Sequence, residues 1–208
     1  MKFNTKNLFI LSSVCFFYIL SNFSLVFSED TLVRAKIGIQ INSDDRYSMA
    51  KSKDRLKSGD LLRIYVHPEK ASFIYVIYSD KKKVSLLNIV EQKNLTSTLV
   101  LPSVNEYYQV DGNSSFEIFT IICSPTELSQ IDNVVNSGNS YTTWASLEKK
   151  MIQKSKITLM EKSATPFAIA GNVRGINKSN TNDSFEKKLH IFSGKSFVMK
   201  RYEFIVKK

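Results

Sequence analysis

Cysteine is scarce in this chain of 208 residues, and its scarcity excludes a scaffold held together by disulfides. The sequence contains only Cys15 and Cys123. Cys15 lies in an N-terminal leader that we expect to be removed, so Cys123 remains alone and no intramolecular disulfide forms. Because Cys123 ends the most apolar run of the chain, we predict a small, buried core residue and not a catalytic nucleophile.

Histidine and glycine are also scarce, which argues against metal centres and phosphate-binding loops. The two histidines, His67 and His190, are far apart in sequence and do not complete a zinc site without carboxylates from elsewhere. We expect His67, just before Pro68, to be an exposed turn residue. The seven glycines form no nucleotide-binding or hydrolase-elbow motif. The sequence therefore predicts no catalytic, cofactor-binding or metal-binding residue, and no cofactor.

A catalytic pair of carboxylates is harder to exclude from the sequence, because Asp and Glu from distant strands can come together in the fold as general acid and base. Asp44-Asp45 and Asp60 are the visible candidates. We expect Asp44-Asp45 to lie in a solvated polar loop and Asp60, which follows Gly59, to cap backbone N–H groups of a turn. Asn180-Thr181-Asn182-Asp183 matches the spacing of a calcium loop only faintly.

The N-terminus has the pattern of an export signal. Lys2 and Lys6 precede the apolar stretch 8–20, and the more polar stretch 21–28 ends on Ser28, a small residue that a signal peptidase accepts. We predict a signal peptide over 1–28 and a mature chain in the periplasm or outside the cell. A retained N-terminal signal anchor is one alternative, and lipid modification of Cys15 is another.

The charge is moderately basic and spread along the chain. The formal net charge is +10, and loss of Lys2 and Lys6 with the leader lowers it to +8. Short clusters such as Lys81-Lys82-Lys83 and Lys207-Lys208 are typical of solvated loops and strand ends. If this charge binds a partner, we expect an anionic surface polymer or a peripheral contact with membrane headgroups, because export argues against nucleic acid.

Strand patterns dominate the mature chain. Runs rich in β-branched and aromatic residues recur about every ten residues, with turn-forming residues between them. Two of them, 73–78 and 116–123, are apolar on both faces, which indicates central strands covered from two sides. The expected strands are 31–41, 61–67, 73–78, 84–90, 97–101, 107–110, 116–123, 156–160, 166–170 and 197–206. We predict a mainly β fold, a single β-sandwich-like domain over 29–208.

One or two short helical insertions interrupt this pattern at about 126–154. The stretch 126–135 accommodates one or two helical turns, and 143–154 is an amphipathic helix with Thr142 or Thr143 as its N-cap. The stretch 43–57 is polar, and we expect a loop or a weak edge there. The Asn- and Ser-rich stretch 171–186 predicts a long exposed loop, and 197–206 predicts a closing strand.

The strand order over 56–128 resembles a family of exported bacterial envelope proteins, the domain of unknown function 4384 family. The similarity is carried by Leu56-Lys57-Ser58-Gly59-Asp60, by Phe73-Ile74-Tyr75-Val76-Ile77, by Val84-Ser85-Leu86-Leu87 and by Leu101-Pro102, together with the closing strand. The resemblance implies an exported β-domain with no established activity. It defines no functional residues, so none is transferred to this chain.

Aromatic residues are the remaining candidates for a binding surface. Tyr75, Tyr78, Tyr107, Tyr108 and Trp144 would suit a platform that stacks on carbohydrate or holds a peptide. The simpler interpretation is that they belong to the core, because sandwich strands favour Tyr and Phe. We hypothesise a non-enzymatic, exported interaction module of the bacterial cell envelope that binds a protein or a surface polymer. The alternatives are a secreted hydrolase using scattered Asp and Glu, and a membrane-anchored structural subunit.

Overall fold

The computed structural model describes residues 32–89, 94–135, 141–155 and 185–207. All the elements below belong to the unit Leu32–Lys208. The predicted leader, the predicted strands 156–160 and 166–170 and nearly all of the predicted loop 171–186 lie outside the described residues.

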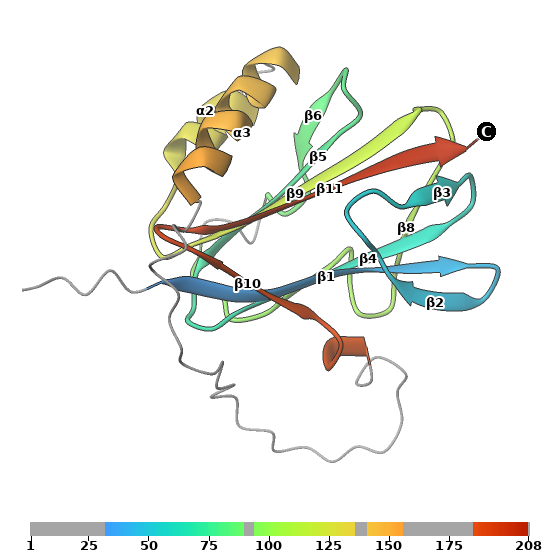
Figure 1. Ribbon diagram of the computed structural model, residues 1–208, viewed down its shortest axis with the longest axis horizontal. Coiled ribbons are helices and arrows are strands. Elements are labelled where there is room, and N and C mark those ends of the chain that lie inside the picture. The colour runs from blue at the N-terminus through green and yellow to red at the C-terminus, as the bar shows by residue number, and fades with distance from the viewer. Residues whose placement is uncertain (1–31, 90–93, 136–140, 156–184, 208) are drawn as a thin grey trace, which may run out of the picture. The chain divides into compact units, whose positions relative to one another are not determined.

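The strands form two sheets packed face to face (Figure 1). Sheet A has the order β10-β1-β4-β7, with β2 beside β1 and β8 beside β4; its strands are β1 (Val33–Ser43), β2 (Arg46–Met49), β4 (Leu61–Pro68), β7 (Leu99–Leu101), β8 (Tyr108–Gln109) and β10 (His190–Gly194). Sheet B has the order β3-β11-β9-β5-β6; its strands are β3 (Arg55–Lys57), β5 (Phe73–Ser79), β6 (Val84–Leu86), β9 (Phe116–Ser124) and β11 (Val198–Lys207). The mainly β sandwich that the sequence predicts is confirmed.

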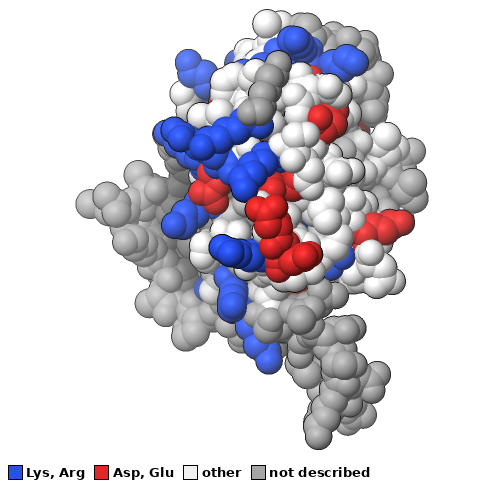
Figure 2. Space-filling model, turned by 90° about the vertical axis from the view of Figure 1, so that its right-hand side faces the viewer, with Lys and Arg blue, Asp and Glu red and all other residues white. Residues whose placement is uncertain are grey.

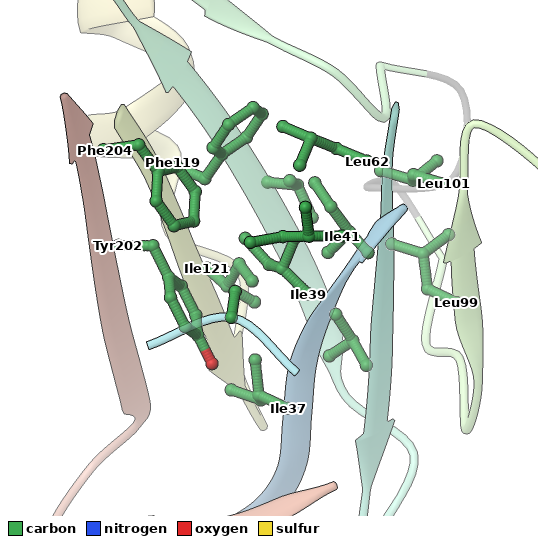
Figure 3. Packing of buried hydrophobic residues seen from close by; sticks show 14 of the residues in the cluster. Ile37, Ile39, Ile41, Leu62, Leu99, Leu101, Phe119, Ile121, Tyr202 and Phe204 are labelled. Carbon is green, nitrogen blue, oxygen red and sulfur yellow. The ribbon is translucent and has the colours of Figure 1, made fainter. Parts of the chain in front are cut away.

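The main core lies between the two sheets. Successive side chains of a strand point to opposite faces, so every second residue of each long strand faces the opposing sheet. Figure 3 shows aliphatic residues of sheet A meeting aromatic and aliphatic residues of sheet B; those labelled are Ile37, Ile39, Ile41, Leu62, Leu99, Leu101, Phe119, Ile121, Tyr202 and Phe204. Each fully buried side chain of this kind contributes about 1.5–3 kcal/mol of hydrophobic stabilisation.

A second core covers the other face of sheet B. Helices α2 (Ser129–Val135) and α3 (Tyr141–Ser155) lie over this face (Figure 1), and Ile131, Trp144 and Met151 pack there against Tyr75, Ile77 and Ile122. The prediction that β5 and β9 are covered from two sides is therefore confirmed. The predicted N-cap is wrong, because α3 begins at Tyr141 and places Thr142 and Thr143 inside its first turn.

A charged network fastens α3 to sheet B. Glu148 of α3 is buried, accepts a hydrogen bond from the Thr120 hydroxyl and lies 3.3 Å from Nε of Arg201. Arg201 also binds Glu203, whose carboxylate lies 2.8 Å from Nζ of Lys81. Each carboxylate of this network thus has a cation beside it, as a buried charge requires.

The polar stretch 43–57 holds two short edge strands, β2, which pairs with β1, and β3, which pairs in parallel with β11. The prediction of a loop or a weak edge there is confirmed. One strand differs from the sequence prediction: β10, which no pattern predicts, pairs with the first half of β1. His190, Ile191 and Ser193 of β10 are exposed and only Phe192 packs, partly buried, against the main core, so this strand is too weakly buried to show a recognisable alternation. Its place depends on backbone hydrogen bonds to β1.

Ile121→Asp should be far more damaging than Lys82→Asp. Ile121 is 0% exposed between the sheets, where an unpaired carboxylate costs several kcal/mol. Lys82 is exposed in a turn, where substitutions change stability by about 0.5 kcal/mol or less. Thermal unfolding of both variants measures the difference, and similar midpoints would contradict the central position of β9.

Candidate functional site

A cavity of about 200 Å³ lies between the sheets at the beginning of β4 and β9 and is open to solvent on one side. Sheet A and the loop after β8 line one wall, and sheet B with the residue after β6 lines the other. The lining residues are Leu62, Tyr78, Leu87, Tyr108, Gln109, Val110, Asp111, Glu117 and Phe119. Leu62, Val110 and Phe119 also belong to the main core, so the floor of the cavity is apolar.

The alternation of β9 places a carboxylate inside the sandwich. Phe119, Ile121 and Cys123 face sheet A, and Glu117 precedes Phe119 by two residues, so its side chain shares that face. Glu117 is 7% exposed. Tyr78 of β5 pairs with Phe119 across the strands and donates its hydroxyl to the Glu117 carboxylate.

The environment of Glu117 disfavours its ionised form. Burial raises the pKa of Glu117, and the nearby carboxylates Asp111 and Asp80 raise it further, while the hydrogen bond from Tyr78 opposes them. Burial also raises the pKa of the Tyr78 hydroxyl, reinforced by Glu117. Among the residues that the structure describes, no Lys or Arg forms an ion pair with Glu117. The described residues that line the cavity therefore include two acidic side chains, Glu117 and Asp111, and no Lys or Arg.

The rim of the cavity is the turn that follows β8, and the side chain of Asp111 holds this turn in shape. Asp111 accepts hydrogen bonds from the backbone N and the side-chain Nδ2 of Asn113, both at 2.8 Å. The neighbouring turn is tied to it, since Gly59 N donates to Val110 O at 2.8 Å and Val110 N donates to Asp60 O at 2.9 Å. Gly112 has a φ of +75°, and an added Cβ would lie 2.9 Å from Cβ of Ser58, so only glycine suits this position.

Acidic and basic side chains are segregated at one end of the molecule. Figure 2 shows the end at which β11 finishes: acidic side chains form a band across this face, and Lys and Arg side chains gather along one side of it. The net charge of the chain is positive, yet a local stretch of its surface is acidic.

The aspartates that the sequence singles out have structural roles. Asp44 and Asp45 are exposed in the turn after β1, as predicted, with φ of 50° and 59°. Asp60 accepts a hydrogen bond from Lys57 N at 2.8 Å, so its predicted capping role is confirmed. The structure does not bring these residues together into a catalytic pair. Asn180–Asp183 lies outside the described residues.

The expectation for His67 is wrong. His67 lies within β4 and is partly buried, with Nδ1 at 3.2 Å from Thr98 Oγ1. Its Nε2 is buried and has no hydrogen-bond partner in the described part of the chain. Burial lowers the pKa of His67. A strand continues through Pro68 because β4 pairs with β1 up to that residue, which the local His-Pro sequence does not indicate.

The five aromatic candidates do not form a single platform. Tyr75 and Trp144 are buried between sheet B and the helices, which confirms the core interpretation for both. The Tyr107 ring lies 3.8 Å beneath the Arg63 guanidinium. Tyr78 and Tyr108 do come together, because both line the cavity.

Within the residues that are described, no group of three or more His, Cys, Asp or Glu side chains is placed to hold a metal ion. No helix in the same part of the chain has the length and apolarity needed to cross a membrane.

Comparisons of the chain with family models, with curated proteins and with solved structures find no match. The resemblance to the envelope family stays a prediction.

Glu117 is the site residue that sequence reasoning missed. A signal for it was present, because Glu117 stands in register with Phe119, Ile121 and Cys123 on one face of the most apolar run. A carboxylate on the buried face of a strand marks a candidate site. The partners Tyr78 and Asp111 carry no such signal, since they come from other segments.

Cys123 should be unreactive in the folded protein. Its side chain is 0% exposed, and burial raises the pKa of the thiol, so little of the nucleophilic thiolate forms. A thiol reagent added to the protein beginning at residue 29 should label Cys123 only after denaturant is added. Rapid labelling without denaturant would contradict the buried position.

Glu117→Gln should stabilise the protein at neutral pH, and the gain should shrink as the pH falls. The pKa of Glu117 is raised above the unfolded value of 4.5. Its charge therefore costs stability above the folded-state pKa, and the cost disappears where both states are protonated. Glutamine removes this charge and keeps an oxygen for the Tyr78 hydroxyl.

Urea denaturation at several pH values measures this effect. Glu127→Gln is the matched control, because Glu127 is exposed and its substitution should have no comparable pH dependence. A gain for Glu117→Gln that is the same at every pH would contradict an ionised, desolvated Glu117.

Proposed function

We propose that the protein is an exported, non-enzymatic interaction domain of the bacterial envelope that binds a partner protein by taking one of its side chains into the cavity. The observation that carries the proposal is Glu117, a buried carboxylate that lines an open cavity. Burying a carboxylate without an opposite charge beside it costs folding free energy. A residue that carries such a cost and lines an open cavity is a candidate for ligand binding.

The size of the cavity supports a single side chain as its ligand. Pockets for drug-sized molecules have volumes of about 300–1,000 Å³, whereas this cavity has about 200 Å³. Interfaces between proteins commonly depend on a few anchor residues that fill such pockets. The apolar floor formed by Leu62 and Phe119 would contact the stem of the anchor, and the polar rim would contact its end.

A protein partner accounts for the cavity better than an anionic polymer. Glu117 lines the cavity, and Asp111 is at its rim, so an anionic ligand would meet like charges there. The net positive charge of the chain supports a second, weaker attraction to anionic surfaces. Export is supported by the leader-like sequence of residues 1–28, and the envelope by the resemblance of residues 56–128.

A hydrolase is the second candidate, and the raised pKa of Glu117 is the observation that favours it. A carboxyl group of this kind is suited to act as a general acid. Hydrolysis of a glycosidic bond takes a second carboxylate on the other side of the bond. Asp111 is the other acidic residue of the cavity lining, but both its oxygens hold Asn113. This geometry is better suited to a rigid rim than to a base.

Leu87→Trp should weaken retention of the protein on purified cell envelope. Leu87 lines the cavity, and the larger indole would fill it. Leu95→Trp is the matched control, because Leu95 is 54% exposed and is not among the lining residues. Wild-type protein and the control should sediment with the envelope, and Leu87→Trp should remain in solution. Equal sedimentation of all three would overturn the role of the cavity.

The same sedimentation separates a protein partner from an anionic polymer. Binding that depends on net charge falls steeply as salt is raised, because the Debye length shortens to about 8 Å at physiological ionic strength. Protease treatment of the envelope should abolish retention if the partner is a protein. Retention that survives protease, depends on salt and is unaffected by Leu87→Trp would indicate an anionic polymer instead.

A further inference from the structure

We propose that the cavity takes a primary ammonium group on an aliphatic stem, the chemistry of a lysine side chain. This inference rests on the proposed binding function and specifies the anchor residue. In this proposal the ammonium group forms an ion pair with the carboxylate of Glu117, and the aliphatic stem packs against the apolar floor formed by Leu62, Val110 and Phe119.

The two buried glutamates of the fold provide the first argument. Glu148 is 5% exposed and has the Arg201 guanidinium at 3.3 Å. Glu117 is 7% exposed and has no Lys or Arg ion-pair partner in the described segments, but it faces a cavity open to solvent. The chain thus supplies a cation to one buried carboxylate and leaves room for a cation beside the other.

The electrostatic surroundings of Glu117 favour a cation over an anion or a neutral group. Asp111 and Asp80 both act on Glu117, so three carboxylates contribute to the negative potential at the cavity. Attraction between charges is stronger where protein replaces water. An entering ammonium would stabilise the ionised form of Glu117 and offset its desolvation.

The shape and lining of the cavity fit an aliphatic stem. A volume of about 200 Å³ corresponds to roughly seven water molecules at about 30 Å³ each, which is room for a short chain of methylene groups. Leu62, Leu87 and Phe119 supply the apolar contacts. Tyr78 and Tyr108 place aromatic rings in the same lining, and such rings attract a cation near their faces.

Lysine fits this site better than arginine or a metal ion. A guanidinium binds best as a planar fork on both oxygens of a free carboxylate, and Tyr78 already donates to Glu117. An ammonium is a compact charge that needs only one position. A divalent metal takes several oxygen ligands, and no group of three suitable side chains is found in the described part of the chain.

The test is a titration of the protein beginning at residue 29 with two small probes. N-acetyl-lysine amide carries the ammonium and the stem, and N-acetyl-norleucine amide carries a similar stem without the charge. Binding is followed by the methyl NMR signals of Leu62 and Leu87. We expect saturable shifts with the lysine probe and binding about tenfold weaker or absent with the norleucine probe.

Variants then assign the effect to Glu117. Glu117→Gln should weaken binding of the lysine probe about tenfold or more, while the exposed-site control Glu127→Gln should leave it unchanged. Unfolding of each variant is measured in parallel. Asp111→Asn, which keeps one of the two oxygens that accept hydrogen bonds from Asn113, serves as a second cavity variant with a smaller expected loss.

Three results would overturn the inference: equal affinity for both probes, unchanged binding in Glu117→Gln, or displacement of the lysine probe by calcium at equal concentration. The outcome is separable from that of the proposed function. If Leu87→Trp abolishes envelope retention but the lysine probe does not bind, the cavity is a binding site for a different side chain. If the probe binds but envelope retention is unaffected by Leu87→Trp, the cavity recognises lysine, and the proposal that it binds an envelope partner is wrong.

Discussion

The rest of the structure depends on the need to cover sheet B on both faces. β5 and β9 carry apolar residues on both faces, one face toward sheet A and the other toward the helices. A strand of this kind is stable only between two layers. Sheet A supplies the first layer, and α2 and α3 supply the second. The chain segments that connect the strands, and the charged network around Glu148 that holds α3, follow from this single requirement.

The same alternation produces the candidate site where the apolar pattern ends. At Glu117 the inward-facing position of β9 becomes a carboxylate, while the backbone pairing with β5 and β11 continues. The side chain therefore stays inside, where Tyr78 and the turn at Asp111 limit its exposure to water. At this end the turn at Asp111 and Gly112 connects β8 of sheet A to β9 of sheet B, and Asp111 of this turn lines the cavity. The proposed binding site thus lies on strands that packing holds in position.

Two buried carboxylates lie against sheet B, Glu148 of α3 in the charged network and Glu117 in the proposed binding cavity. Thr120 donates a hydrogen bond to Glu148 and Arg201 neutralises it, so these side chains satisfy each other and stabilise the packing of α3. Glu117 lies three residues before Thr120 and faces the other way, into the cavity. One residue of register decides which of the two environments a side chain enters.

The sequence by itself determined the fold class, the two-sided burial of 73–78 and 116–123, the helical insertion, the buried Cys123 and the capping role of Asp60, because each depends on local alternation or on turn chemistry within a few residues. The tertiary structure alone decided the rest. β10 is only partly buried and is placed by its pairing with β1. The start of α3 at Tyr141 differs from the local N-cap signal, and His67 is drawn into a strand by the pairing of β4 with β1. The site belongs to this second group, since Tyr78, Asp111 and Glu117 come from different segments and only the packing of the two sheets brings their side chains around one cavity.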